Sequence, residues 1–119
     1  MFGSQANSIL GTRATLALLG ELATISAAGT GQSTATAIAT ANTVVSTVAA
    51  GTGVKLPGAT VVSANDRLWV ANHGANTLAV YPPTGGSICH GTANVPLMVA
   101  VGRAADFFCI DGTNYSAIF

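Results

Sequence analysis

The sequence predicts an all-β protein: an antiparallel two-sheet sandwich, jelly-roll-like, of about eight strands. Valine, isoleucine and threonine make up 32 of the 119 residues, and these β-branched side chains fit a pleated strand better than a helix. Fourteen glycines and four prolines divide the chain into short runs. Short β-branched runs between such turn residues are typical of sandwiches and barrels.

The first half of the chain gives the weaker signals. Residues 14–19 precede Gly20 and fit a short helix or a strand equally well. In residues 33–50 alanine favours a helix, but the many threonines and valines oppose it. Across residues 34–41, threonine or isoleucine alternates with alanine. This period of two predicts a strand with one face of small side chains.

The second half predicts its strands more clearly. Asn72, Gly74 and Asn76 surround a tight turn, so the strands on either side of it are expected to pair as a hairpin. Pro82 to Gly86 is expected to form a loop, and Asp111-Gly112 is a strong hairpin-turn signal between the last two strands. The predicted strands cover residues 59–62, 67–72, 76–81, 95–101, 104–110 and 115–119.

Charge is unusually scarce. Four basic and four acidic residues give a formal net charge of zero, so no basic surface is expected for nucleic acid or an anionic membrane. No stretch of about 20 mostly apolar residues is present for a spanning helix, and the N-terminus lacks the pattern of a secretory signal. A domain with so few surface charges is poorly suited to free solution, which favours a protein that works inside an assembly.

Side chains that could carry chemistry are few. One glutamate is too few for a pair of catalytic glutamates, and an aspartate pair would need Asp66, Asp106 or Asp111 to converge. Residues Cys89, His90 and His73 match no standard zinc spacing. Cysteines 89 and 109 are therefore interpreted as structural thiols rather than a disulfide or a metal or redox site. The sequence predicts no enzyme, no cofactor and no metal.

Four aromatic residues could stack on a sugar or a base, although such residues on strands more often belong to the core. We expect core positions for all four, which are Trp69, Tyr81, Phe107 and Phe108.

From Val48 onward the residues follow a recognisable pattern. A run through Gly51-Thr52-Gly53 leads to a strand that ends Val70-Ala71-Asn72-His73-Gly74-Ala75-Asn76 and continues as Thr77-Leu78-Ala79-Val80-Tyr81-Pro82. Gly85-Gly86-Ser87-Ile88, a turn with Asn94, Ala100-Val101-Gly102 and Phe107-Phe108 complete the pattern. It resembles a β-sandwich module that recurs among structural proteins of tailed bacteriophages, including capsid decoration (cement) proteins. The resemblance covers about residues 22–119.

The resemblance implies a virion structural protein. We expect a decoration protein on the outside of the capsid, made in the bacterial host cytoplasm, that binds the major capsid protein and stabilises contacts between its subunits. It also implies self-association as a homodimer or homotrimer, since cyclic symmetry matches capsid axes. A tail, neck or head-fibre subunit is one alternative. A carbohydrate-binding β-sandwich, with Trp69 or Tyr81 as the stacking platform, is another.

The N-terminal segment, residues 1–20, lies outside the resembling module of residues 21–119. We expect it to make assembly contacts, because its apolar side chains are scattered among small and polar residues. The alternative is that it forms the first strand of the sandwich. The expected interface residues are Phe2, Ile9, Leu10, Leu16, Leu18 and Leu19.

Overall fold

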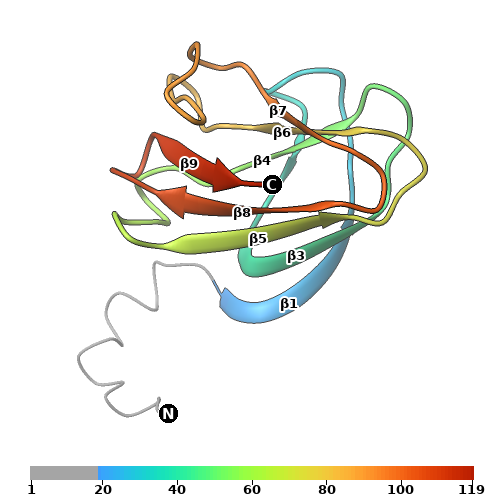
Figure 1. Ribbon diagram of the computed structural model, residues 1–119, viewed down its shortest axis with the longest axis horizontal. Coiled ribbons are helices and arrows are strands. Elements are labelled where there is room, and N and C mark those ends of the chain that lie inside the picture. The colour runs from blue at the N-terminus through green and yellow to red at the C-terminus, as the bar shows by residue number, and fades with distance from the viewer. Residues whose placement is uncertain (1–18) are drawn as a thin grey trace.

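The computed structural model describes residues 19–119, and this part of the chain is all-β, with nine strands and no helix. The strands are β1 Leu19–Ser26, β2 Thr36–Ala37, β3 Thr40–Thr47, β4 Gly53–Lys55, β5 Arg67–Asn72, β6 Leu78–Tyr81, β7 Leu97–Val99, β8 Ala104–Cys109 and β9 Tyr115–Ile118. They form a five-stranded sheet, β1-β3-β5-β8-β9, and a four-stranded sheet, β2-β4-β6-β7. The two sheets face each other in a sandwich-like arrangement (Figure 1).

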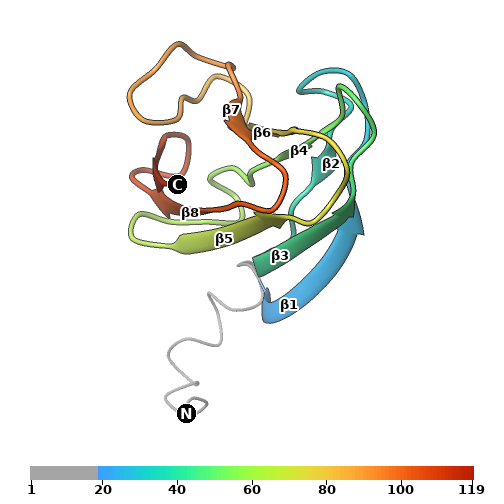
Figure 2. The ribbon, with the colours of Figure 1, turned by 45° about the vertical axis from the view of Figure 1, so that its right-hand side comes forward.

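The path of the chain differs from the prediction. Strands β1 to β6 alternate between the two sheets, and β1, β3 and β5 pair in parallel, as do β2, β4 and β6. The first six strands therefore wind like three turns of a short β-solenoid (Figure 2). Only β6–β7, β5–β8 and β8–β9 are antiparallel. The prediction of an antiparallel sandwich is thus wrong for the N-terminal half, and a jelly roll is not confirmed.

The predicted hairpin at residues 67–81 explains this error. Strands β5 and β6 lie in different sheets, so the turn between them carries the chain across the sandwich instead of folding it back. The buried Asn72 side chain holds that turn: Nδ2 donates to the carbonyl oxygens of Asn76 and Val99, and Oδ1 accepts from the Gly74 N–H, each at 2.9 Å. A Cβ on Gly74 would lie 2.5 Å from Val48 Cγ2, so only glycine lets the turn pack this closely.

Other predicted elements have mixed outcomes. The Asp111-Gly112 turn joins β8 and β9 as a hairpin, as predicted. Residues 59–62 form a turn rather than a strand, because the Gly58 carbonyl accepts from the N–H groups of both Val61 and Val62. The strand nearest to these residues on their N-terminal side is β4, Gly53–Lys55. The predicted boundary at residue 20 falls inside β1, which begins at Leu19.

The core lies between the sheets and takes side chains from both. Alternation is clearest on β8, where Ala105, Phe107 and Cys109 are buried and the residues between them are partly exposed. The Tyr115 hydroxyl donates to the Pro57 carbonyl at 2.7 Å, which satisfies the one polar group of a fully buried ring. Burial raises the pKa of Tyr115 well above its ordinary value, so this hydroxyl stays a hydrogen-bond donor.

Replacing the Asn72 amide tests the role of the crossing turn. We expect Asn72→Ala to lower the free energy of unfolding by about 3 kcal/mol, because it leaves buried backbone groups without partners. Ser116→Ala, at an exposed position of β9, should cost at most about 0.5 kcal/mol. Urea unfolding of both variants measures the difference. Equal losses would show that the buried amide does not hold the fold.

Candidate functional site

The side chains considered for metal binding are not brought together. In residues 19–119, no three histidine, cysteine, aspartate or glutamate side chains gather as metal ligands would. His73 follows β5 at the end of the sheet near Arg103, whereas His90 lies beside the β8–β9 turn, at the sheet's other end. The same described part contains no helix able to cross a membrane.

The sequence offers three aspartates that could form a catalytic carboxylate pair. Each of them makes its own local contact. Asp66 accepts a hydrogen bond from the Ser63 N–H at 2.9 Å. Asp106 lies 3.6 Å from an Arg67 nitrogen on the neighbouring strand. Asp111 belongs to the β8–β9 turn. Each of the three carboxylates is thus engaged in a contact of its own.

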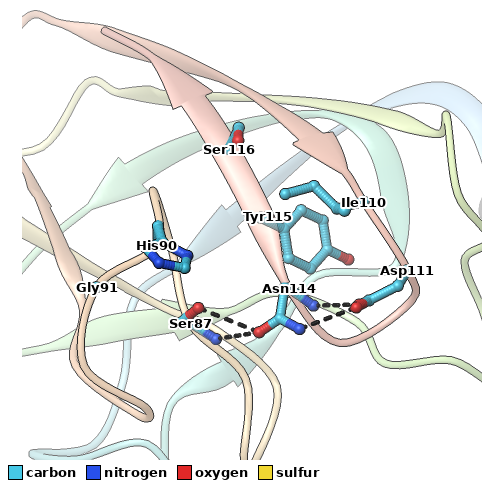
Figure 3. Close-up of a pocket in the computed structure, with 8 residues that line it drawn as sticks. All are labelled: Ser87, His90, Gly91, Ile110, Asp111, Asn114, Tyr115 and Ser116. Atoms are coloured by element: carbon cyan, nitrogen blue, oxygen red, sulfur yellow. Dashed lines mark hydrogen bonds between the residues drawn. The ribbon is translucent and has the colours of Figure 1, made fainter.

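A shallow pocket of about 430 Å³ lies beside β9 (Figure 3). The Asn114 amide oxygen accepts from the N–H and the hydroxyl of Ser87, at 3.0 and 3.1 Å. Asp111 accepts from the Asn114 side chain and from the N–H groups of Thr113 and Asn114. Because Ser87 donates to an amide rather than to His90, the pocket holds no nucleophile paired with a base.

These contacts also set the charge of the pocket. The hydrogen bond from the Asn114 side chain, followed by those from the Asn114 and Thr113 backbone, holds the pKa of Asp111 below its ordinary value of 3.8. An acid that stays ionised at neutral pH is a poor proton donor. Its role is to fix the turn before β9.

The two cysteines are free, and they differ in exposure. Cys109 is buried and its sulfur accepts from the Gly112 N–H at 3.0 Å. Burial raises the pKa of its thiol, so it stays protonated and unreactive. Cys89 is exposed, and with His90 it forms the centre of a turn closed by a hydrogen bond from Gly91 N–H to Ile88 C=O. Both central residues have positive φ angles, 54° and 60°, as in a type I′ turn.

Several apolar side chains are exposed on the outer face of the five-stranded sheet. Strand register aligns one row of side chains across the five strands: Leu22, Asn42, Trp69, Asp106 and Ile118. Leu22, Trp69 and Ile118 are 60%, 38% and 74% exposed. We call this surface, together with Arg67 and Phe108 in the adjacent row, the Trp69 face.

The charged groups of the Trp69 face are engaged locally. The Arg67 guanidinium lies 5.0 Å from the centre of the Phe108 ring and pairs with Asp106. A hollow of about 230 Å³ lies among these three side chains, Ser116, Ala117 and Ile118. Exposed ion pairs of this kind contribute little to stability, about 0–1 kcal/mol. Their effect here is to leave the face with no unbalanced charge.

The expectation that all four aromatic residues are core is therefore wrong for Trp69, Phe108 and Tyr81, which lie on the outer faces of the sheets. Leu68 and Val70 are fully buried, so strand alternation directs the residue between them outward. Phe107 is core, and Phe108 is partly exposed. Tyr81 lies on the outer face of the other sheet, with its ring against Gly53. The alternation of the strand, which the sequence shows, decides the direction of the Trp69 side chain, and its aromatic character does not.

Most of the predicted interface residues lie outside the described part of the chain. These are Phe2, Ile9, Leu10, Leu16 and Leu18. Leu19 is the first residue of β1.

No protein-family model, curated protein or solved structure matches the chain.

The depressed pKa of Asp111 makes a testable contribution to stability. A carboxyl whose pKa is lower in the folded than in the unfolded state stabilises the fold above its unfolded value, near 3.8, and loses this effect as the pH falls below it. We expect Asp111→Asn to be less stable than the parent at neutral pH and to lose less stability on acidification. Urea unfolding at neutral and acidic pH measures both. A parallel decline of the two proteins would contradict this role.

Proposed function

We propose that this chain is a structural protein of a bacteriophage virion, a capsid decoration protein that docks on the outside of the head shell through the Trp69 face. The observation that carries the proposal is the exposure of Leu22, Trp69 and Ile118 in one row of that face. Exposed apolar patches of this kind mark protein interfaces more often than they mark free surface.

The motif residues of the resemblance support a structural role rather than chemistry. Asn72 and Gly74 hold the crossing turn, and the Asn76 amide donates to the Val48 carbonyl at 2.8 Å. Each of these polar groups is used to shape the sandwich. The motif therefore builds a scaffold, and the surface left for a partner is the face that the scaffold exposes.

The proposed mechanism is the burial of apolar side chains where each copy contacts the capsid, repeated over the whole shell. Apolar area removed from water contributes about 25 cal/mol per Å², and tryptophan is among the residues that dominate interface energies. One copy binds with modest affinity, because association also costs translational freedom. A copy that touches two neighbouring capsid subunits links them, and many such links stabilise the shell. The balanced pair of Arg67 and Asp106 leaves no net charge to repel the shell.

A carbohydrate-binding sandwich is the main alternative. Trp69 and Tyr81 occupy the outer faces of different sheets, so they cannot stack on one sugar together. A sugar platform would rely on Trp69 and Phe108 alone. Trp69 fluorescence on titration with oligosaccharides separates the two readings, since a decoration protein should give no saturable change. Among the other virion roles, a tail subunit would bind tails in place of heads.

Binding to heads gives the direct test. We expect the protein to co-sediment with undecorated heads of the phage that encodes it, and Trp69→Lys to weaken binding at least about tenfold, which corresponds to about 1.4 kcal/mol. Met98→Lys is the matched control, because Met98 is an exposed apolar residue on the outer side of the four-stranded sheet. Its binding should equal that of the parent. Failure of the parent to bind heads, or an equal loss in both variants, would overturn the proposal.

A further inference from the structure

Strand β1 is a long edge without a neighbour on its outer side. It pairs only with β3 among the described residues, and it spans eight residues along the rim of the sheet (Figure 1). The other three edge strands, β2, β7 and β9, have two, three and four residues. Short edge strands are one of the ways in which proteins prevent pairing between chains. Of the four edges, β1 is the one that lacks this protection.

The sequence of β1 offers no other protection. It contains no lysine and no proline, and Glu21 is its single charge. Lysine, proline and bulges near the middle of an edge are what usually stop a second strand from adding. The register shifts of β1 lie towards its two ends, between Leu19 and Leu22 and between Ile25 and Ser26. Its central residues, 22 to 25, form a regular and uncharged edge.

At Thr24, the backbone N–H and C=O groups of β1 point away from the sheet's neighbouring strand, β3. The Ile25 carbonyl accepts from the Ser46 hydroxyl at 3.5 Å, and the Ala27 N–H donates to the Thr47 carbonyl at 2.9 Å. Both groups therefore point at β3. Because the backbone groups of successive residues point to opposite sides of a strand, the N–H and C=O of Thr24 point away from β3. They are positioned to pair with a further strand.

The inner face of β1 also leaves the core partly open. Ala23, Ile25 and Ala27 point inward and are only partly buried, and Ile25 and Ala27 pack against the core cluster. A strand added beside β1 with small or apolar inward residues would cover them. The edge therefore presents both unpaired backbone and apolar surface.

We propose that β1 pairs antiparallel with β1 of a second copy, about a two-fold axis that passes between the two Thr24 residues. This register places Thr24 opposite Thr24 and Ala23 opposite Ile25, so the apolar inner faces of the two copies become continuous. Leu22 then lies opposite Ser26 on the outer face. The five-stranded sheets of the two copies join into one.

Charge favours a second copy as the occupant. The single charge of each strand, Glu21, lies outside the regular central residues 22 to 25, so these residues bring no like charges opposite each other. The formal net charge of zero adds no long-range repulsion between copies. A two-fold axis also satisfies both Thr24 backbones at once, because each donates to the other. The proposal does not depend on the capsid role.

A charge-pair design tests the register. Thr24→Lys and Thr24→Asp each place like charges opposite each other at the axis, and we expect either change to raise the dissociation constant about tenfold or more. Mixing the two variants restores opposite charges and should restore a dimer of twice the mass of one chain. Ser116→Lys, an exposed residue of β9 at the far edge of the same sheet, is the control and should remain dimeric. Sedimentation equilibrium over a concentration series measures all four samples.

Several results would overturn the proposal. One is a parent that stays monomeric up to millimolar concentration. Another is a dimer that survives in Thr24→Lys or that the mixture of variants does not restore. A monomeric parent that becomes dimeric after deletion of residues 1–18 would assign the edge of β1 to that segment of its own chain. Since head binding is measured separately, a parent that stays monomeric but binds heads would refute only this inference.

Discussion

The fold depends on the amide of one buried residue, Asn72. Its side chain joins the crossing turn to β7, and its backbone N–H and C=O pair with Arg103 and Gly102 in the connection to β8. One residue thus ties the end of the five-stranded sheet to both the turn and the four-stranded sheet. Because an unpaired polar group inside a protein costs free energy, these bonds hold the chain to a crossing where a hairpin could have formed. The passage of the chain from β5 in one sheet to β6 in the other is the result.

The path of the chain between the two sheets decides which side chains form the core and which remain on the surface. Winding in parallel turns places Leu68, Val70 and Val80 inside and directs Trp69 and Tyr81 outward on opposite sides. It also leaves β1 as a long edge among the described strands, whereas the other edge strands, β2, β7 and β9, are short. The polar residues with the most hydrogen bonds lie in turns and hold them. The surfaces left for partners are the Trp69 face and the outer edge of β1. Both suit proteins better than small molecules.

The sequence located most strands of the second half but not their sheets. Period-two alternation and turn residues placed β5, β6, β8 and β9 within one or two residues. A turn such as Asn72 to Asn76 shows that the chain changes direction, but whether it folds back or crosses depends on Val48 and Val99, which are distant in sequence. The three-residue strand β4 is too short to show a period. For the site, alternation fixed the outward direction of Trp69, but only the pairing of five strands shows that Leu22 and Ile118 share its face.

Electron cryo-microscopy of undecorated heads mixed with the protein tests the central claim most directly. We expect ordered density on the outside of the shell, with the five-stranded sheet facing the capsid and Trp69 touching a capsid subunit. The four-stranded sheet, with Tyr81 and Met98, should face solvent. Density on the tail or neck, an inverted orientation with Tyr81 against the shell, or bare heads would contradict it.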